Sequence, residues 1–111
     1  LRVRPGPLAN RPTPPPALDP AAIARLAAAI RIETVSTEAA PPGAAAIDTF
    51  ARHLEESFPR VHAALRRERV GGGALLFTWP GRDAKTPALL LAAHQDVVPA
   101  GPGWTHPPFS G

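Results

Sequence analysis

The chain contains no cysteine and no methionine among its 111 residues. The absence of cysteine excludes disulfide bonds and thiolate metal sites, although it does not decide the cellular compartment. Because there is no methionine, Leu1 is not a retained initiator, and the chain stops on a Pro-rich loop. We therefore expect it to be the N-terminal fragment of a longer protein, of unknown oligomeric state. A leader or anchor upstream of Leu1 would make that protein secreted or membrane-anchored, and without one it would be cytoplasmic.

Long apolar runs and concentrated charge are also missing. No apolar run approaches the roughly 18 residues of a membrane-spanning helix, so we expect no membrane span within the chain. The net charge is +3, but eleven of the twelve basic residues are arginines scattered from Arg2 to Arg82 among the acids, and aromatic residues make up only 5%. Nucleic-acid binding usually needs a concentrated basic patch with aromatic partners. The composition therefore predicts a solvated surface and no nucleic-acid partner.

Proline is abundant, with sixteen residues in the chain and six of them within residues 1–18. Because proline fixes φ and lacks an N–H donor, we expect residues 1–18 to be an extended connector. The stretch "PTPP" at Pro12 to Pro15 also fits a bare PxxP docking motif, but Ala17 stands where the longer basic pattern requires proline. The alternative to a spacer is a non-catalytic binding module with a Pro-rich docking tail.

Two helices are predicted in the first half. Asp19 can cap the first helix, Pro20 suits its first turn, and an apolar stripe at three- and four-residue spacing continues to about Arg31. The second helix should run from about Ala44 to Ser57, and Pro59 should end it.

Three strands should follow. Alternation from Val61 to Arg66 predicts the first strand, and the triple glycine at 71–73 predicts a turn into the second, over Ala74–Trp79. The unbroken apolar run Ala88–Ala93 is typical of a central strand covered on both faces. The order of helices and strands indicates an α/β layer architecture over residues 19–111, with its later elements missing.

Two pairs in the sequence have a histidine two residues before an acid. His53 and Glu55 fall inside the second predicted helix, where residues two apart point to different sides, so we expect them to be unrelated surface residues. His94 and Asp96 follow the run Ala88–Ala93, and in an extended chain they share one face. A neutral imidazole there can bind a metal while a carboxylate orients it, although a hydrogen-bonded structural histidine would also fit this spacing. His106, in a loop beside two prolines, is a poorer candidate ligand.

Five stretches together resemble the start of a known enzyme family. They are "AIRIETVS" (29–36), "FPRVH" (58–62), "ALLFTWPG" (74–81), "PALLLAAHQDVVPA" (87–100) and "WTHPPFSG" (104–111). In order and spacing they resemble the co-catalytic zinc peptidases and amidohydrolases, a family that includes carboxypeptidase S, Gly-Xaa carboxypeptidase, aminoacylase and acetylornithine deacetylase. The nearest resemblance is to the branch of carboxypeptidase S and the N-fatty-acyl-amino acid hydrolases. Glu33 departs from the family's common "IPTVS", which has proline there.

The resemblance implies a function and a partial site. It makes His94 a ligand of one metal and Asp96 the catalytic residue that orients it, in an enzyme with two zinc-type ions. It implies a peptide or N-acyl amino acid as substrate. It also makes residues 19–111 the N-terminal, incomplete part of an α/β catalytic domain with a mixed sheet flanked by helices. The remaining ligands and the general base would follow Gly111, so we expect this fragment by itself to be inactive.

Overall fold

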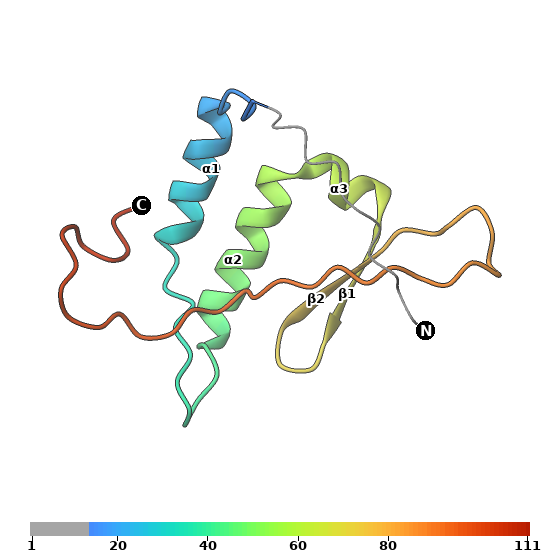
Figure 1. The fold of residues 1–111 in the computed structure, drawn as a ribbon. Helices are drawn as coiled ribbons and strands as arrows, with labels where there is room; N and C mark the ends of the chain where they lie inside the picture. Colours follow the sequence, from blue (N-terminus) through green and yellow to red (C-terminus); the bar gives the residue numbers. More distant parts are fainter. Residues whose placement is uncertain (1–13) are drawn as a thin grey trace, which may run out of the picture.

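A computed structural model describes the protein over residues 14–111. Three helices and one β-hairpin make up its regular structure (Figure 1). They are α1 (Pro20–Ile30), α2 (Ala44–Ser57), α3 (Pro59–Ala64), β1 (Arg66–Val70) and β2 (Ala74–Thr78). Most of the predicted connector, residues 1–13, lies outside the described part, and residues 14–18 are exposed without helix or strand.

Both predicted helices are confirmed. Asp19 caps α1 with its side chain, whose Oδ1 accepts a hydrogen bond from the backbone N–H of Ala21 at 2.9 Å. The Arg25 guanidinium lies over the ring of Phe58, 5.6 Å from its centroid, at the far end of α2. The apolar stripe of α1 is nevertheless open to solvent, since the exposed fraction of Leu26 is 63%.

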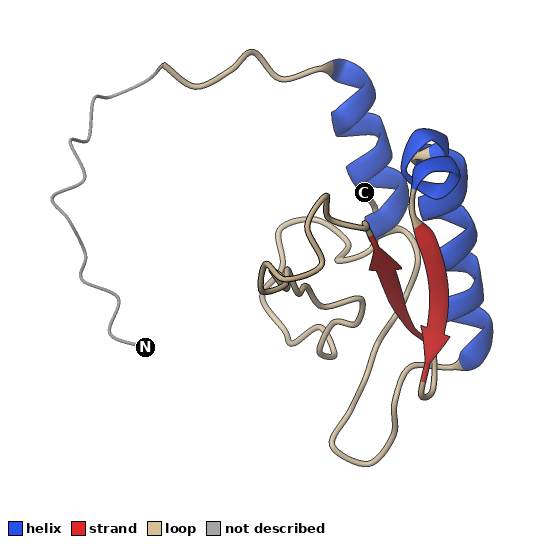
Figure 2. Cartoon of the chain, turned by 90° about the vertical axis from the view of Figure 1, so that its right-hand side faces the viewer, coloured by secondary structure: helices blue, strands red, loops and turns tan. Residues whose placement is uncertain are grey.

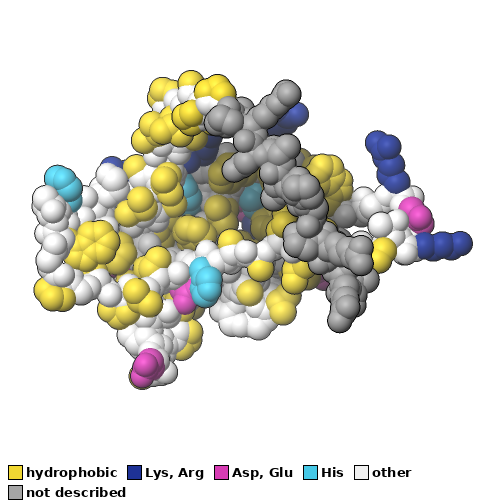
Figure 3. Space-filling view, viewed as in Figure 1, with side chains coloured by type: hydrophobic (Ala, Val, Ile, Leu, Met, Phe, Trp, Pro, Cys, Tyr) yellow, Lys and Arg dark blue, Asp and Glu magenta, His cyan; other side chains and the backbone are white. Residues whose placement is uncertain are grey.

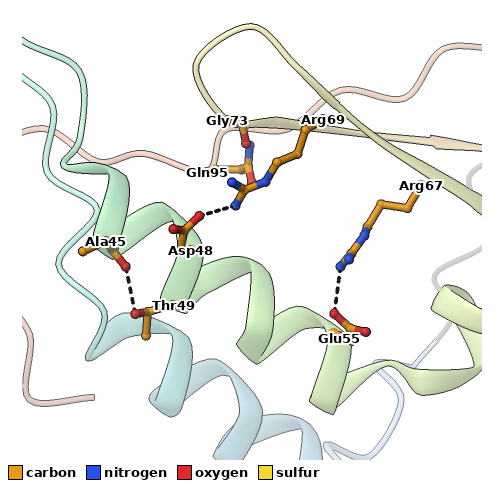
Figure 4. Close-up of polar contacts among 8 residues, drawn as sticks. All are labelled: Ala45, Asp48, Thr49, Glu55, Arg67, Arg69, Gly73 and Gln95. Carbon is orange, nitrogen blue, oxygen red and sulfur yellow. Dashed lines mark hydrogen bonds and ion pairs between the residues drawn. The ribbon is translucent and has the colours of Figure 1, made fainter.

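The small apolar core of the described residues lies on α2. Ile47 and Ala51 occupy successive turns of one helix face and are each only 7% exposed. The hairpin lies alongside this helix, while the C-terminal loops run on the other side of the strands (Figure 2). Two ion pairs join the helix to β1, from Arg67 to Glu55 and from Arg69 to Asp48 (Figure 4). Both pairs are solvent-exposed, so each contributes about 0–1 kcal/mol to stability.

The hairpin has the predicted glycine turn. Its strands pair antiparallel with Arg66 opposite Thr78 and Val70 opposite Ala74, which leaves 71–73 as the turn. Gly71 and Gly73 have φ values of 58° and 138°, in the region that glycine adopts without a steric penalty.

The strand predicted from Val61 to Arg66 is wrong. Pro59–Ala64 forms the short helix α3, and β1 begins only at Arg66. Pro59 ends α2 as expected, but at the same time it occupies the first turn of a new helix, where its missing N–H is harmless. His62 fixes this turn, because its Nδ1 lies 3.0 Å from the Phe58 carbonyl oxygen and its ring packs edge-on against Phe77 at 5.0 Å.

The predicted central strand Ala88–Ala93 is not formed either. This segment has no strand partner among residues 14–111, and the exposed fractions of Leu89, Leu90 and Leu91 are 85%, 77% and 84%. A strand exists only when a neighbour accepts its hydrogen bonds, and an apolar run cannot supply that neighbour. Figure 1 shows the segment as an unpaired trace that crosses the molecule.

The α/β prediction holds for what the structure describes. Helices lie against an antiparallel sheet of two strands, which makes a partial α/β arrangement rather than a full mixed sheet. Its one parallel element, within residues 14–111, is an isolated bridge between Val35 and Val97. None of the described helices is long and apolar enough to cross a bilayer.

Gly73 should tolerate no side chain. A Cβ atom on Gly73 would lie 2.8 Å from Ile47 Cγ2, and its φ of 138° is strained for other residues. We expect Gly73→Ala to lower the free energy of unfolding by about 1–3 kcal/mol. Gly72→Ala is the matched control, because a Cβ there meets nothing within 4 Å. Urea unfolding of both variants checks this, and equal stabilities would contradict the packing of the turn against Ile47.

Candidate metal site

Two backbone hydrogen bonds hold the candidate site in place, and we call them the backbone clamp. The Ser36 N–H donates to the Val97 carbonyl oxygen at 2.9 Å, and the Val97 N–H donates to the Thr34 carbonyl oxygen at 3.0 Å. Thr34 is 3% exposed, so the segment that follows α1 is anchored at this point. The clamp brings residues 34–36 beside residues 96–97 and thereby places Asp96, which directly precedes Val97.

His94 and Asp96 do face each other. Nδ1 of His94 lies 3.0 Å from Oδ1 of Asp96. An ionised carboxylate only accepts hydrogen bonds, so in the neutral imidazole this contact places the proton on Nδ1 and leaves the lone pair on Nε2. The His94 side chain is 91% exposed, which leaves that lone pair open to a ligand. Its role as a metal ligand and the catalytic role of Asp96 remain predictions.

Asp96 is stabilised as a carboxylate. The Ser36 hydroxyl donates to its Oδ2 at 2.6 Å, and this bond is the main cause that lowers the pKa of Asp96 below the usual 3.8. The hydrogen bond from His94 and one from the Asp96 backbone lower the pKa further. Donors aimed at a charged carboxylate favour that charged form.

The pH dependence follows from the direction of this shift. Because the folded pKa of Asp96 lies below its unfolded value, its contribution to stability is present above about pH 3.8 and is lost as the pH falls through the folded pKa. We expect NMR of the Asp96 carboxyl carbon to show a lower titration midpoint in the folded chain than in urea. Equal midpoints in the two states would contradict the hydrogen bonds described above.

An open depression lies beside this pair. Its volume is about 540 Å³, and its lining includes Ile47, residues 72–74 where the hairpin turn meets β2, and residues 92–96. The Gln95 amide nitrogen approaches the Gly73 carbonyl oxygen at 3.5 Å, which ties the site to the hairpin turn (Figure 4). On the face seen in Figure 3, one histidine side chain lies directly beside an acidic one, with hydrophobic side chains around them. The depression could therefore receive a partly apolar ligand next to His94.

The other histidines do not form comparable pairs. His53 Nε2 lies 3.5 Å from the Ser57 hydroxyl, while Glu55 pairs with Arg67, so the two members of this second pattern point to different partners, as predicted. His106 lies exposed in a loop.

The residues present fit one part of a metal centre. Nowhere in residues 14–111 do three His, Cys, Asp or Glu side chains gather closely enough to hold an ion. An exposed imidazole with a free Nε2 and a carboxylate on Nδ1 is nevertheless the usual arrangement of a histidine ligand and its orienting partner. His94 fits as a single ligand, and a complete site would need donors from elsewhere.

Ser36 and Thr34 were not predicted as site residues. Ser36 is the last residue of "AIRIETVS", one of the stretches that carry the family resemblance. The hydroxyl of Ser36 was the one feature of the sequence that could have indicated this role. Its partner Asp96 lies 60 residues away, and local patterns do not reveal such a contact.

The chain is similar to several curated proteins. It is 39% identical to carboxypeptidase S of Saccharomyces cerevisiae over 106 residues, which cover 86% of this chain and 18% of that protein. It is 42% identical to an N-fatty-acyl-amino acid synthase/hydrolase of Bos taurus over 89 residues, 78% of this chain and 18% of the relative. A probable carboxypeptidase S-like protein of Dictyostelium discoideum is 42% identical over 64 residues, 56% of this chain and 12% of the relative.

These similarities cover a limited part of each relative. The chain spans less than a fifth of the length of the curated relatives it matches. No protein-family profile matches the chain. No solved structure matches it either.

Proposed function

Since the chain belongs to the carboxypeptidase S and N-fatty-acyl-amino acid hydrolase branch, we propose that it forms part of a metal-dependent hydrolase. Its substrate would be a peptide or N-acyl amino acid, cleaved at the amide bond next to a free carboxylate. The observation that carries the proposal is the pairing of His94 Nδ1 with Asp96 Oδ1 at 3.0 Å beside an open depression.

Each of the two side chains has a defined task. Asp96 accepts the Nδ1–H of His94, which holds the imidazole in one tautomer and raises the basicity of Nε2. His94 would hold one of two zinc-type ions through Nε2. Ions held there would supply Lewis-acid polarisation of the scissile carbonyl and activation of water at neutral pH. The resemblance assigns the general base and the other ligands to residues outside this chain.

The 111-residue chain should bind zinc weakly by itself. One histidine supplies one of the four ligands that zinc normally takes, so we expect the wild-type chain to bind Zn²⁺ only slightly more tightly than its His94→Ala variant. Isothermal titration calorimetry of both measures the difference. Tight binding at a one-to-one ratio would show that the chain holds a complete site and would contradict the proposal.

The proposed activity can be tested with matched substrates. The protein encoded by the complete reading frame that contains these residues should hydrolyse a dipeptide or an N-acyl amino acid with a free carboxylate. It should turn over the corresponding C-terminal amides much more slowly, and a chelator should remove the activity until zinc is returned. No turnover of any of these substrates would favour the non-catalytic binding module.

A further inference from the structure

We propose that Ser36 is a positioning residue, which fixes the Asp96 carboxylate and through it the His94 imidazole. The inference rests on the proposed function only for its effect on catalysis. The geometric part concerns a chain of three side chains, Ser36, Asp96 and His94, which we call the Ser–Asp–His relay.

The two oxygens of Asp96 have separate partners in this relay. Oδ2 accepts from the Ser36 hydroxyl at 2.6 Å, and Oδ1 lies 3.0 Å from His94 Nδ1. A distance of 2.6 Å is in the range of a charge-assisted O–H···O⁻ bond, the stronger class of hydrogen bond. Rotation of an aspartate about χ2 is only loosely restricted by its own torsion preferences. The hydroxyl therefore decides which carboxylate oxygen meets the imidazole.

Packing cannot orient His94 in place of this relay. The His94 side chain is 91% exposed, whereas the Asp96 side chain is 37% exposed. His94 Nδ1 has Asp96 as its hydrogen-bond partner, so the imidazole orientation depends on where the carboxylate is held.

The backbone on which Ser36 lies is fixed by its contacts with Val97. Its N–H bonds to the Val97 carbonyl oxygen, and Val35 pairs with Val97 in the parallel bridge. Thr34, two residues earlier, is buried and accepts from the Val97 N–H. The hydroxyl is thus presented from a fixed backbone, as a positioning group needs to be.

The first test measures the His94 tautomer without metal or substrate. In the 111-residue chain at about pH 8, above the ordinary histidine pKa, ¹⁵N NMR should show His94 protonated at Nδ1 alone. Ser36→Ala should give a mixture of tautomers, and Ser36→Thr, which keeps the hydroxyl, should restore the single form. Ser36→Cys is close in size but a weak donor, so it should fold and show the mixture even if Ser36→Ala does not fold. Ser57→Ala, a half-buried serine away from the relay, should change nothing at His94.

The second test measures function in the complete protein. Ser36→Ala or Ser36→Cys should lower zinc affinity and kcat by about 10–100-fold, the usual cost of losing a group that orients a metal ligand, and Ser36→Thr should recover most of the loss. A folded Ser36→Cys chain with the wild-type tautomer would overturn the relay. If the tautomer changes as expected but the complete protein hydrolyses nothing, the relay stands and the proposed function fails.

Discussion

Replacing His94 by alanine in the complete protein is expected to lower kcat/KM by about 10³-fold or more. A metal ion contributes several kcal/mol of transition-state stabilisation, and each 1.36 kcal/mol is worth a factor of ten in rate. The His94 side chain is 91% exposed and lines the depression, so under the proposed function its loss would remove a metal ligand rather than a packing contact. Turnover measured together with zinc content per protein checks the prediction.

The chain provides its own control for this experiment. His53 also precedes an acid by two residues, but it lies on α2 near Ser57, and its Glu55 pairs with Arg67. His53→Ala should leave kcat/KM and zinc content near the wild-type values. If His94→Ala keeps normal turnover and metal, or if both variants lose activity equally, the assignment of His94 fails.

Asp96→Asn should lower zinc affinity and kcat by about 10–100-fold, since partners that orient a ligand usually have effects of this size. The substitution keeps the shape of the side chain but removes its charge. An amide can also turn an N–H toward His94 and favour the wrong tautomer. Zinc competition with a chromogenic chelator and steady-state kinetics measure the two effects.

Asp48→Asn is the control for the change from carboxylate to amide. Asp48 makes an exposed ion pair with Arg69 between α2 and β1, and such pairs contribute little. Its variant should therefore keep the zinc affinity of the wild type. An Asp96→Asn protein with unchanged affinity and kcat would mean that His94 is oriented by something other than Asp96.

Local sequence signals were sufficient for the helices and the turn. Asp19 and Pro20 define the start of α1, and the observed bounds of α2 equal the predicted ones, because caps and apolar periodicity act within a few residues. The turn at 71–73 was likewise predicted from its own three glycines.

The strands depended on partners that a local pattern does not contain. Residues 61–64 alternate like a strand, but Pro59 begins a helical turn that His62 stabilises through the Phe58 carbonyl. The run Leu89–Leu91 is apolar enough for a central strand, yet no described strand pairs with it.

The candidate site was also predicted only in part. The two-residue spacing correctly placed His94 and Asp96 side by side, because extended backbone alternates its side chains regardless of sheet pairing. The contribution of Ser36 could not be predicted, since it depends on a bridge between residues about 60 positions apart.

The most direct test of the central claim is anomalous diffraction at the zinc edge from crystals of the complete protein. The account predicts a zinc peak about 2.0–2.1 Å from His94 Nε2, the usual Zn–N distance, with Asp96 still bonded to Nδ1. A zinc peak away from His94, or an Nε2 that binds no metal in the zinc-loaded active protein, would contradict it.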